Sequence, residues 1–202
     1  IMSFFWSMCD MQGYTPTAFV GLKNYKNVLT NTMFVKILIN TLKYVFWSLV
    51  IGYISPLVVA LMLNETVHFK SGFKTLIYFP HVLPGVAVSL MWYLMYFPDE
   101  GGMLNMILSF FGMGPLEWLQ NEALTIPLII IAITWKGMPG SMLMYYATLQ
   151  GVNRDLYEAA TIDGAGIFRR LWSITIPQIS GTMLLMLINQ IISIFQIMEQ
   201  PM

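Results

Sequence analysis

Four long apolar stretches constrain the fold of this chain more than any other feature of its sequence. They run roughly over residues 37–63, 75–97, 123–148 and 179–198. Each reaches the about 20 residues that an α-helix needs to cross the hydrocarbon layer of a bilayer. Prolines lie inside three of them, and transmembrane helices tolerate prolines because neighbouring helices satisfy the freed carbonyl groups. The sequence therefore predicts an all-α, polytopic membrane protein with four complete transmembrane helices.

The scarcity of charge supports this class. Only 10% of the residues are charged and 57% are hydrophobic, whereas a soluble domain carries roughly 25% charged residues. The net charge of zero gives no indication of a nucleic-acid partner. The single Cys9 excludes an intramolecular disulfide and a cluster of thiolate ligands. His68 and His81 lie far apart in the sequence, so neither a metal site nor a cofactor is predicted.

We expect the elements at the two ends of the chain to be incomplete. The apolar run over residues 1–9 is too short to span a bilayer, and we interpret it as the end of a preceding helix. No final element follows the last apolar stretch. We therefore expect residues 1–202 to form one transmembrane domain that is incomplete at both ends.

Loop charge predicts the orientation of the helices. The loops over 64–74 and 150–178 contain basic residues, namely Lys70, Lys74, Arg154, Arg169 and Arg170. The loop over 98–122 contains no Lys or Arg, and its charged residues are Asp99, Glu100, Glu117 and Glu122. The positive-inside rule places the first two loops in the cytoplasm and the third outside. Alternation places 10–36 outside despite its three lysines, and we follow the alternation because the other loops agree with it.

The predicted external loop contains a short apolar segment. Glycines bracket residues 103–111, whose composition predicts a helix lying at the membrane interface, and Trp118 suits an interfacial aromatic residue. A packed loop and a surface that contacts a partner are both compatible with this pattern.

Motifs for the common chemistries are absent. The sequence contains neither a phosphate-binding loop nor a nucleophile elbow. Carboxylates are missing from the centres of the predicted spans, where ion-coupled carriers often keep an ionisable group. This absence weakens an ion-coupled transporter and an intramembrane protease. We predict that the chain is not an enzyme and that the source of energy lies on another chain.

The predicted cytoplasmic loop over 150–178 has the pattern of two short helices joined by a turn. Asn153 suits a helix N-cap, and four residues recur at helical spacing on one face: Leu156, Ala159, Ala160 and Asp163. Gly164 and Gly166 permit a turn, a second helical piece follows over 168–174, and Pro177 suits the beginning of the next span. From the residues alone, a docking helix and an ordinary amphipathic connector both remain open.

The same loop resembles the EAA signature of binding-protein-dependent ABC importer permeases. That pattern is Glu-Ala-Ala, three residues, Gly, nine residues, Ile, one residue and Leu-Pro. This chain has Glu158-Ala159-Ala160, Gly164, Ile174 and Ile176-Pro177, and departs only by Ile176 in place of Leu. Asp163 and Ala165 complete the longer form of the motif.

Two further segments resemble the carbohydrate-uptake branch of this family. Residues 19–25, Phe-Val-Gly-Leu-Lys-Asn-Tyr, resemble the FVGLDNY segment of its first permease subunit, as found in maltose, lactose and glycerol-phosphate importers. Trp135-Lys136-Gly137 with Leu149-Gln150-Gly151 resembles the branch's WKG and AGLQ segments. The resemblance covers essentially the whole chain and implies a helical permease of the type I ABC importer kind in a bacterial or archaeal cell membrane.

The resemblance also implies partners and site residues. Two ATP-binding subunits, a second permease subunit and an extracytoplasmic solute-binding protein are expected, with a sugar or oligosaccharide as substrate. The residues implied to dock the ATPase subunit are Glu158, Ala159, Ala160, Asp163, Gly164 and Ala165. An importer for a non-sugar solute is the alternative, which the segment over 19–25 disfavours. A second alternative is an ion-coupled secondary carrier.

Three polar or aromatic residues near the span centres are candidates for the solute pathway. Asn189 and Gln190 lie about midway along the fourth span, and Trp135 lies near the middle of the third. An amide at this depth needs a partner, which can be the solute or a neighbouring helix. Trp135 can stack on a sugar ring or fill the core.

Overall fold

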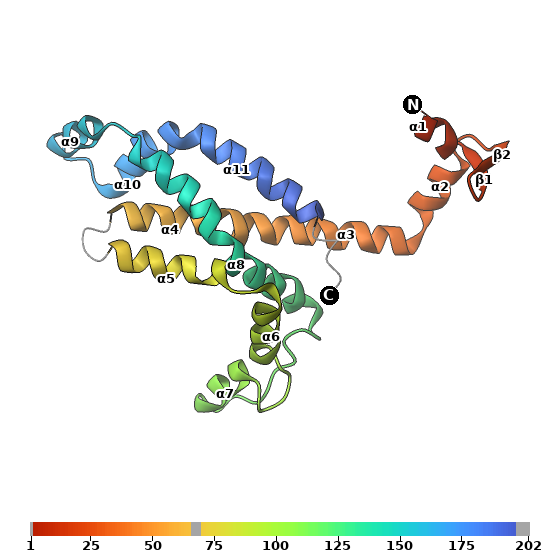
Figure 1. Ribbon diagram of the computed structural model, residues 1–202, viewed down its shortest axis with the longest axis horizontal. Coiled ribbons are helices and arrows are strands. Elements are labelled where there is room, and N and C mark those ends of the chain that lie inside the picture. The colour runs from red at the N-terminus through yellow and green to blue at the C-terminus, as the bar shows by residue number, and fades with distance from the viewer. Residues whose placement is uncertain (1, 66–69, 197–202) are drawn as a thin grey trace. The chain divides into compact units, whose positions relative to one another are not determined.

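The computed structural model describes residues 2–65 and 70–196 (Figure 1). The chain divides into two compact units, Ile1–Lys43 and Tyr44–Met202. The division falls inside helix α3 (Thr32–Trp47).

The N-terminal unit contains a small β-hairpin that the sequence did not predict. Helix α1 (Met2–Ser7) is followed by strands β1 (Cys9–Gln12) and β2 (Thr15–Phe19), then by helix α2 (Lys23–Thr30). The strands pair antiparallel, with an irregularity in register between Asp10 and Met11. Gly13 takes a φ of 63° in the connecting turn, a conformation that glycine adopts without steric strain.

Residues of the segment over 19–25 hold this unit together. The Asn24 side-chain amide donates to the carbonyl oxygens of Ser7 at 3.1 Å and Cys9 at 3.0 Å. The Tyr25 hydroxyl lies 2.5 Å from the Ser7 hydroxyl. Gly21 has a φ of 57°. This part of the family-like motif therefore joins α2 to the end of α1 and the beginning of the hairpin.

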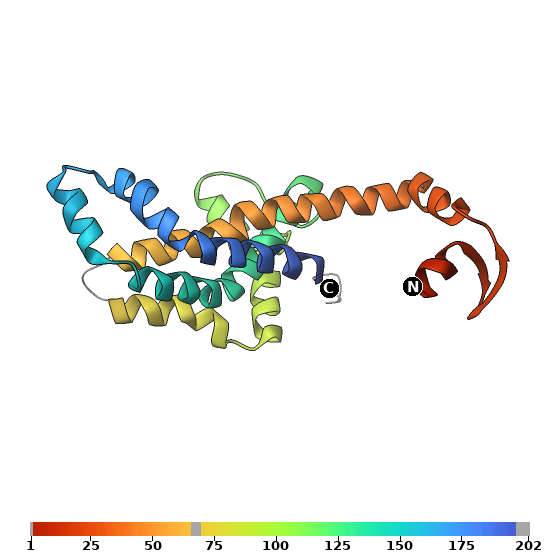
Figure 2. The same cartoon turned by 90° about the horizontal axis from the view of Figure 1, so that it is seen from above.

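The second unit consists of helices (Figures 1 and 2). In chain order they are the π-helix η1 (Ser48–Tyr53), α4 (Ile54–Glu65), α5 (Lys70–Val82), α6 (Gly85–Met95), α7 (Met103–Phe110), α8 (Glu122–Gln150), α9 (Arg154–Ile162), α10 (Ile167–Arg170), the π-helix η2 (Leu171–Thr175) and α11 (Ile176–Gln196). Helix α7 confirms the short helix predicted in the loop over 98–122, and α8 confirms the third predicted span.

The described residues contain three helices that are long and apolar enough to cross a membrane, or four spans if one bent pair is counted. The three are Thr32–Glu65, Glu122–Gln150 and Ile167–Gln196. The second predicted span is instead broken, because Ser71–Val82 and Gly85–Met95 meet at 97°. Pro84 lacks an N–H and disfavours helical backbone at Leu83, which explains the break.

The boundaries of two other predicted spans also need correction. The first span begins at Thr32 rather than at residue 37, and the last extends back to Ile167. Pro177 therefore does not open the last span, as the sequence had suggested. Residue 198, its predicted end, lies outside the described residues.

The two π-helical segments explain how Pro56 and Pro177 fit into the first and the last of these long helices. Pro56 lacks the N–H that would bond the carbonyl of Gly52, and Gly52 lies in η1. Pro177 stands in the same relation to Ser173, which lies in η2. A π-helical turn already interrupts the i to i−4 bonding ladder. The α-helical hydrogen bond that each proline cannot make therefore falls in a segment where the regular α-helical bonding is already interrupted.

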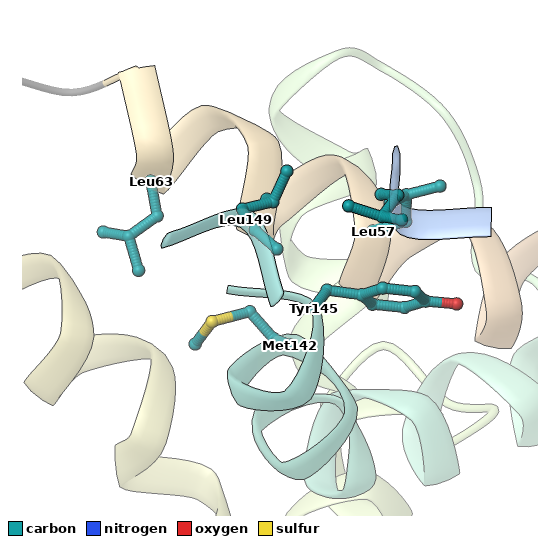
Figure 3. Close-up of a cluster of buried hydrophobic side chains, with 7 residues drawn as sticks. Leu57, Leu63, Met142, Tyr145 and Leu149 are labelled. Atoms are coloured by element: carbon teal, nitrogen blue, oxygen red, sulfur yellow. The ribbon is translucent and has the colours of Figure 1, made fainter. Parts of the chain in front are cut away.

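The larger buried cluster lies between α4, α8 and α11 (Figure 3). Its members are Leu57, Ala60, Leu63, Met142, Tyr145, Leu149 and Ile179. Two polar contacts tie the nearby helix ends, which are predicted to face the cytoplasm. The Gln150 amide donates to the Asn64 side chain at 2.7 Å, and the Lys74 ammonium lies 4.2 Å from the centre of the Tyr146 ring.

The predicted external loop is organised around one buried amide. The Asn105 side chain is 2% exposed. Its nitrogen lies within hydrogen-bond distance of the carbonyls of Phe97, Pro98, Asp99 and Leu116. Its oxygen accepts from the Leu116 N–H at 3.0 Å and from the Trp118 indole at 2.9 Å. Trp118, predicted as an interfacial aromatic, thus also anchors this loop.

Replacing Asn105 with Ala is expected to loosen the loop between α6 and α8. Several partly buried donors and acceptors would lose a partner, and an unsatisfied buried group costs about 1–3 kcal/mol. We expect faster limited proteolysis within this loop and a lower unfolding temperature in detergent. Ser109→Ala is the matched control, because Ser109 is exposed and its hydroxyl donates to the Met106 carbonyl of its own helix. Equal behaviour of the two variants would contradict the role of Asn105.

Candidate functional site

Helix α9 begins at the cap that the sequence predicts. The Asn153 side-chain oxygen accepts a hydrogen bond from the Asp155 N–H at 3.0 Å, which satisfies one of the free donors of the first turn. Asp155 also places a negative charge in that turn, where the helix dipole favours it. The first half of the loop is therefore a capped helix with a defined beginning.

Helix α9 ends in a Schellman motif centred on Gly164. The Ala165 N–H donates to the Ala160 carbonyl at 2.8 Å, and the Gly164 N–H donates to the Thr161 carbonyl at 3.0 Å. Gly164 has a φ of 73°, the left-handed conformation that this motif requires and that glycine adopts without strain. The predicted turn is confirmed, and its position explains why glycine stands there.

The six predicted docking residues lie together on α9 and this turn. Glu158, Ala159, Asp163 and Gly164 are exposed, while Ala160 and Ala165 are half-buried. Large apolar side chains surround them without cover from the described residues, since Ile162 is 87% and Phe168 79% exposed. Both views show α9 lying beyond the ends of α8 and α11 (Figures 1 and 2).

A shallow hollow lies beside Glu158. It is lined by Tyr157, Glu158, Thr161, Ile162 and Arg170. The surface therefore combines an exposed carboxylate, two small alanine side chains and uncovered apolar groups. Such a surface suits close packing against another protein, with Glu158 available for a charge-assisted hydrogen bond.

The structure separates the three candidates for the solute pathway. The Gln190 amide donates to the Ser48 hydroxyl at 2.8 Å, and Ser48 is only 1% exposed. A Cβ on Gly52 would lie 2.5 Å from the Gln190 nitrogen, so η1 and α11 approach closely there. Asn189 is exposed and has no hydrogen-bond partner among the described residues. Gln190 therefore already has the interhelical partner that a buried amide needs.

Trp135 belongs to an aromatic group that sequence reasoning did not assemble. Its ring meets Trp92 edge-on at 5.8 Å, and Trp92 stacks on Tyr96 at 5.2 Å. The Trp92 indole N–H is buried and has no partner within residues 2–65 and 70–196. Beside Trp135, the Lys136 ammonium lies 3.2 Å from the place that a Cβ on Gly85 would take. The two tryptophans come from different apolar stretches, so sequence periodicity gave no signal that they meet.

Comparison with known proteins identifies the family. Residues 57–197 match the family described as binding-protein-dependent transport system inner membrane component. The match includes both the loop over 150–178 and the aromatic group. The chain belongs to this family.

Curated members of the family share sequence with the chain along most of its length. The polygalacturonan/rhamnogalacturonan transport system permease protein YteP of Bacillus subtilis is 36% identical over 89% of this chain and 56% of its own length. The trehalose/maltose transport system permease protein MalF of Thermococcus litoralis is 33% identical over 98% of this chain and 68% of its own length. The chain thus spans a little over half of the first of these relatives.

A solved structure shares the fold. The bacterial alginate ABC transporter, in complex with an alginate pentasaccharide-bound periplasmic protein, superposes with a TM-score of 0.76 at 27% identity. The match covers 85% of this chain and 60% of the transporter chain. The inner-membrane permease fold expected from the EAA-like loop is thereby confirmed.

Proposed function

We propose that this chain forms the transmembrane permease part of an ATP-driven importer that takes up a sugar or oligosaccharide delivered by a solute-binding protein. The observation that carries the proposal is the exposed α9 surface, capped at Asn153 and ended by the Schellman motif at Gly164. This surface stands at the end of the helices predicted to face the cytoplasm, where an ATPase subunit would reach it.

The names of the relatives support a carbohydrate as the substrate. They concern polygalacturonan and rhamnogalacturonan, trehalose and maltose, and alginate. These are chains of sugar rings, which proteins bind with aromatic faces and hydrogen-bonding groups. Trp135 and Trp92 supply such faces between α6 and α8. We propose that Trp135 and Asn189 line the solute pathway, whereas Gln190 chiefly joins α11 to η1.

Separate subunits would supply the energy and the other half of the pathway. Two ATP-binding subunits, one of them docked on Glu158, Ala159, Ala160, Asp163, Gly164 and Ala165, would close on ATP and displace α9. A second permease subunit would complete the pathway, and the solute-binding protein would deliver sugar to the external loops. The spans would then alternate between inward-facing and outward-facing states. In this arrangement the chain itself hydrolyses no ATP.

Reconstitution tests this function. The native full-length protein is co-expressed with its neighbouring transporter genes, purified and placed in proteoliposomes with the solute-binding protein inside or outside. We expect uptake of labelled oligosaccharides that requires ATP and the binding protein on the opposite faces of the membrane. Uptake driven by a sodium or proton gradient without ATP would overturn the proposal. ATP-driven uptake restricted to amino acids or ions would overturn the sugar assignment alone.

A further inference from the structure

Four side chains link helix α9 to the end of α10 and to the π-helix η2, which precedes α11. The Tyr157 hydroxyl lies 2.9 Å from the Thr175 hydroxyl. The Arg170 guanidinium donates to the Thr161 hydroxyl at 3.2 Å, and that hydroxyl donates to the Tyr157 carbonyl at 2.7 Å. We call Tyr157, Thr161, Arg170 and Thr175 the α9–η2 strap. The strap bridges the turn over 163–166 at two points.

The strap joins an exposed helix to a buried position. Within α9 only Tyr157 and Ala160 are half-buried, and the other residues are exposed. Thr175, by contrast, is 5% exposed. Tyr157 is therefore the long side chain of α9 that reaches inward. Because the Tyr157–Thr175 bond forms only when Tyr157 reaches this buried position, it favours one position of α9 over others.

The inner end of the strap lies where the helix ladder is irregular. The Ile176 N–H bonds the Leu171 carbonyl, five residues earlier, as in a π-helix. The Thr175 hydroxyl lies 3.5 Å from the Arg170 carbonyl. If Tyr157 donates to Thr175, the Thr175 hydrogen is free to reach that carbonyl. Beyond this point α11 continues as a helix to Gln196.

Movement of α9 can reach η2 across the turn between α9 and α10 only if that turn does not bend, and the strap opposes such bending. Gly164 and Gly166 lie in this turn, and glycine backbone deforms more easily than that of other residues. A push on α9 could therefore be absorbed by the turn. Side-chain bonds across the turn oppose that bending and leave α9 and η2 to move together.

We propose that the α9–η2 strap makes α9 and the beginning of α11 move as one body, so that displacement of α9 shifts the last described span. Tyr157 and Thr175 are positioning residues in this scheme, since they act on the span and touch neither ATP nor solute. The inference rests on the proposed function, because it assigns the path by which movement of a docked ATPase subunit reaches the spans.

The test measures the number of solute molecules imported per ATP hydrolysed. The full transporter is reconstituted with its binding protein and an oligosaccharide that the wild type imports, and Tyr157→Phe is compared with wild type. Losing one hydrogen bond corresponds to about a fivefold change in an equilibrium, so we expect about a fivefold fall in this ratio. The ATPase subunits should still co-purify. Tyr93→Phe is the control, because the Tyr93 ring contacts Phe97 and its hydroxyl has no partner among the described residues; its ratio should not change.

A double-mutant cycle shows whether Tyr157 and Thr175 act through their shared hydrogen bond or whether the two substitutions have independent effects. Thr175→Val should lower the ratio as Tyr157→Phe does, the double variant should behave like either single variant, and Thr175→Ser should retain the wild-type ratio. Unchanged ratios, additive losses, or loss of the ATPase subunits from Tyr157→Phe would each overturn the proposal. Failure of the proposed function would be visible earlier, as absence of ATP-dependent sugar uptake by the wild-type transporter.

Discussion

Glu158→Lys is expected to abolish import while leaving the protein inserted in the membrane. Glu158 is exposed at the edge of the hollow beside α9. Reversing its charge removes the acceptor for a charge-assisted bond and introduces repulsion toward any cationic group that faces it. No buried group among residues 2–65 and 70–196 pairs with the exposed Glu158 carboxylate, so the fold should be unaffected by its loss. We expect uptake to fall below detection and the ATPase subunits to be lost on purification.

Gly164→Asp is expected to cause the same loss of import and of the ATPase subunits, because it strains the backbone. A residue with a Cβ at a φ of 73° is strained by about 1–2 kcal/mol, which weakens the Schellman motif and displaces the end of α9. The new carboxylate would also lie beside Asp163. Gly166→Ala is the matched control, because Gly166 has a φ of −68° and open space around a Cβ. Normal uptake and co-purification in both Glu158→Lys and Gly164→Asp would refute docking at this surface.

Asn189→Ala and Gln190→Ala are expected to have opposite consequences although the residues are adjacent. Removing the Gln190 amide leaves the buried Ser48 hydroxyl without its 2.8 Å partner. Interhelical hydrogen bonds in membranes contribute about 0.6–2 kcal/mol, so Gln190→Ala should lower the unfolding temperature. Asn189 has no such partner within the described part of the chain, so Asn189→Ala should spare stability. Its loss should lower uptake about fivefold, as loss of one hydrogen bond to solute does.

Uptake per folded molecule and thermal unfolding, measured on the same preparations, distinguish these effects. Trp135→Leu belongs in the same series, since it removes an aromatic face and keeps an apolar side chain. It should change the preference among oligosaccharides more than stability. A stability loss for Asn189→Ala with unchanged uptake would remove Asn189 from the pathway.

Local signals in the sequence were enough to predict the first helix and the turn of the loop over 150–178. Asn153 caps the helix through its own side chain, and Gly164 ends it through its own backbone conformation. The residue type alone therefore indicates where the helix begins and where it ends. The apolar run over 123–148 predicted α8 closely for the same reason. The residues that determine a long apolar helix are contiguous in the sequence.

The features that the sequence did not reveal depend on residues far apart in the chain or on backbone geometry. Run length cannot distinguish a straight span from the 97° bend at Pro84. The β-hairpin is stabilised by Asn24 from a later helix, and its short strands carry little alternation. The Asn105 network and the strap depend on which carbonyls and hydroxyls the fold brings near one side chain. Composition does not contain that information.

The π-helical segments η1 and η2 affect how any residue-by-residue map of this protein must be drawn. A π-turn holds an extra residue relative to an α-turn, and one residue corresponds to roughly 100° of rotation about the helix axis. A helical wheel carried unbroken from α3 into α4, or from α10 into α11, would therefore assign the wrong faces after each segment. When residues are chosen for cross-linking or labelling, the helix face of each residue should be assigned separately before and after residues 48–53, and likewise before and after residues 171–175. Alignments with relatives that lack either π-turn should show a single-residue gap at the same place.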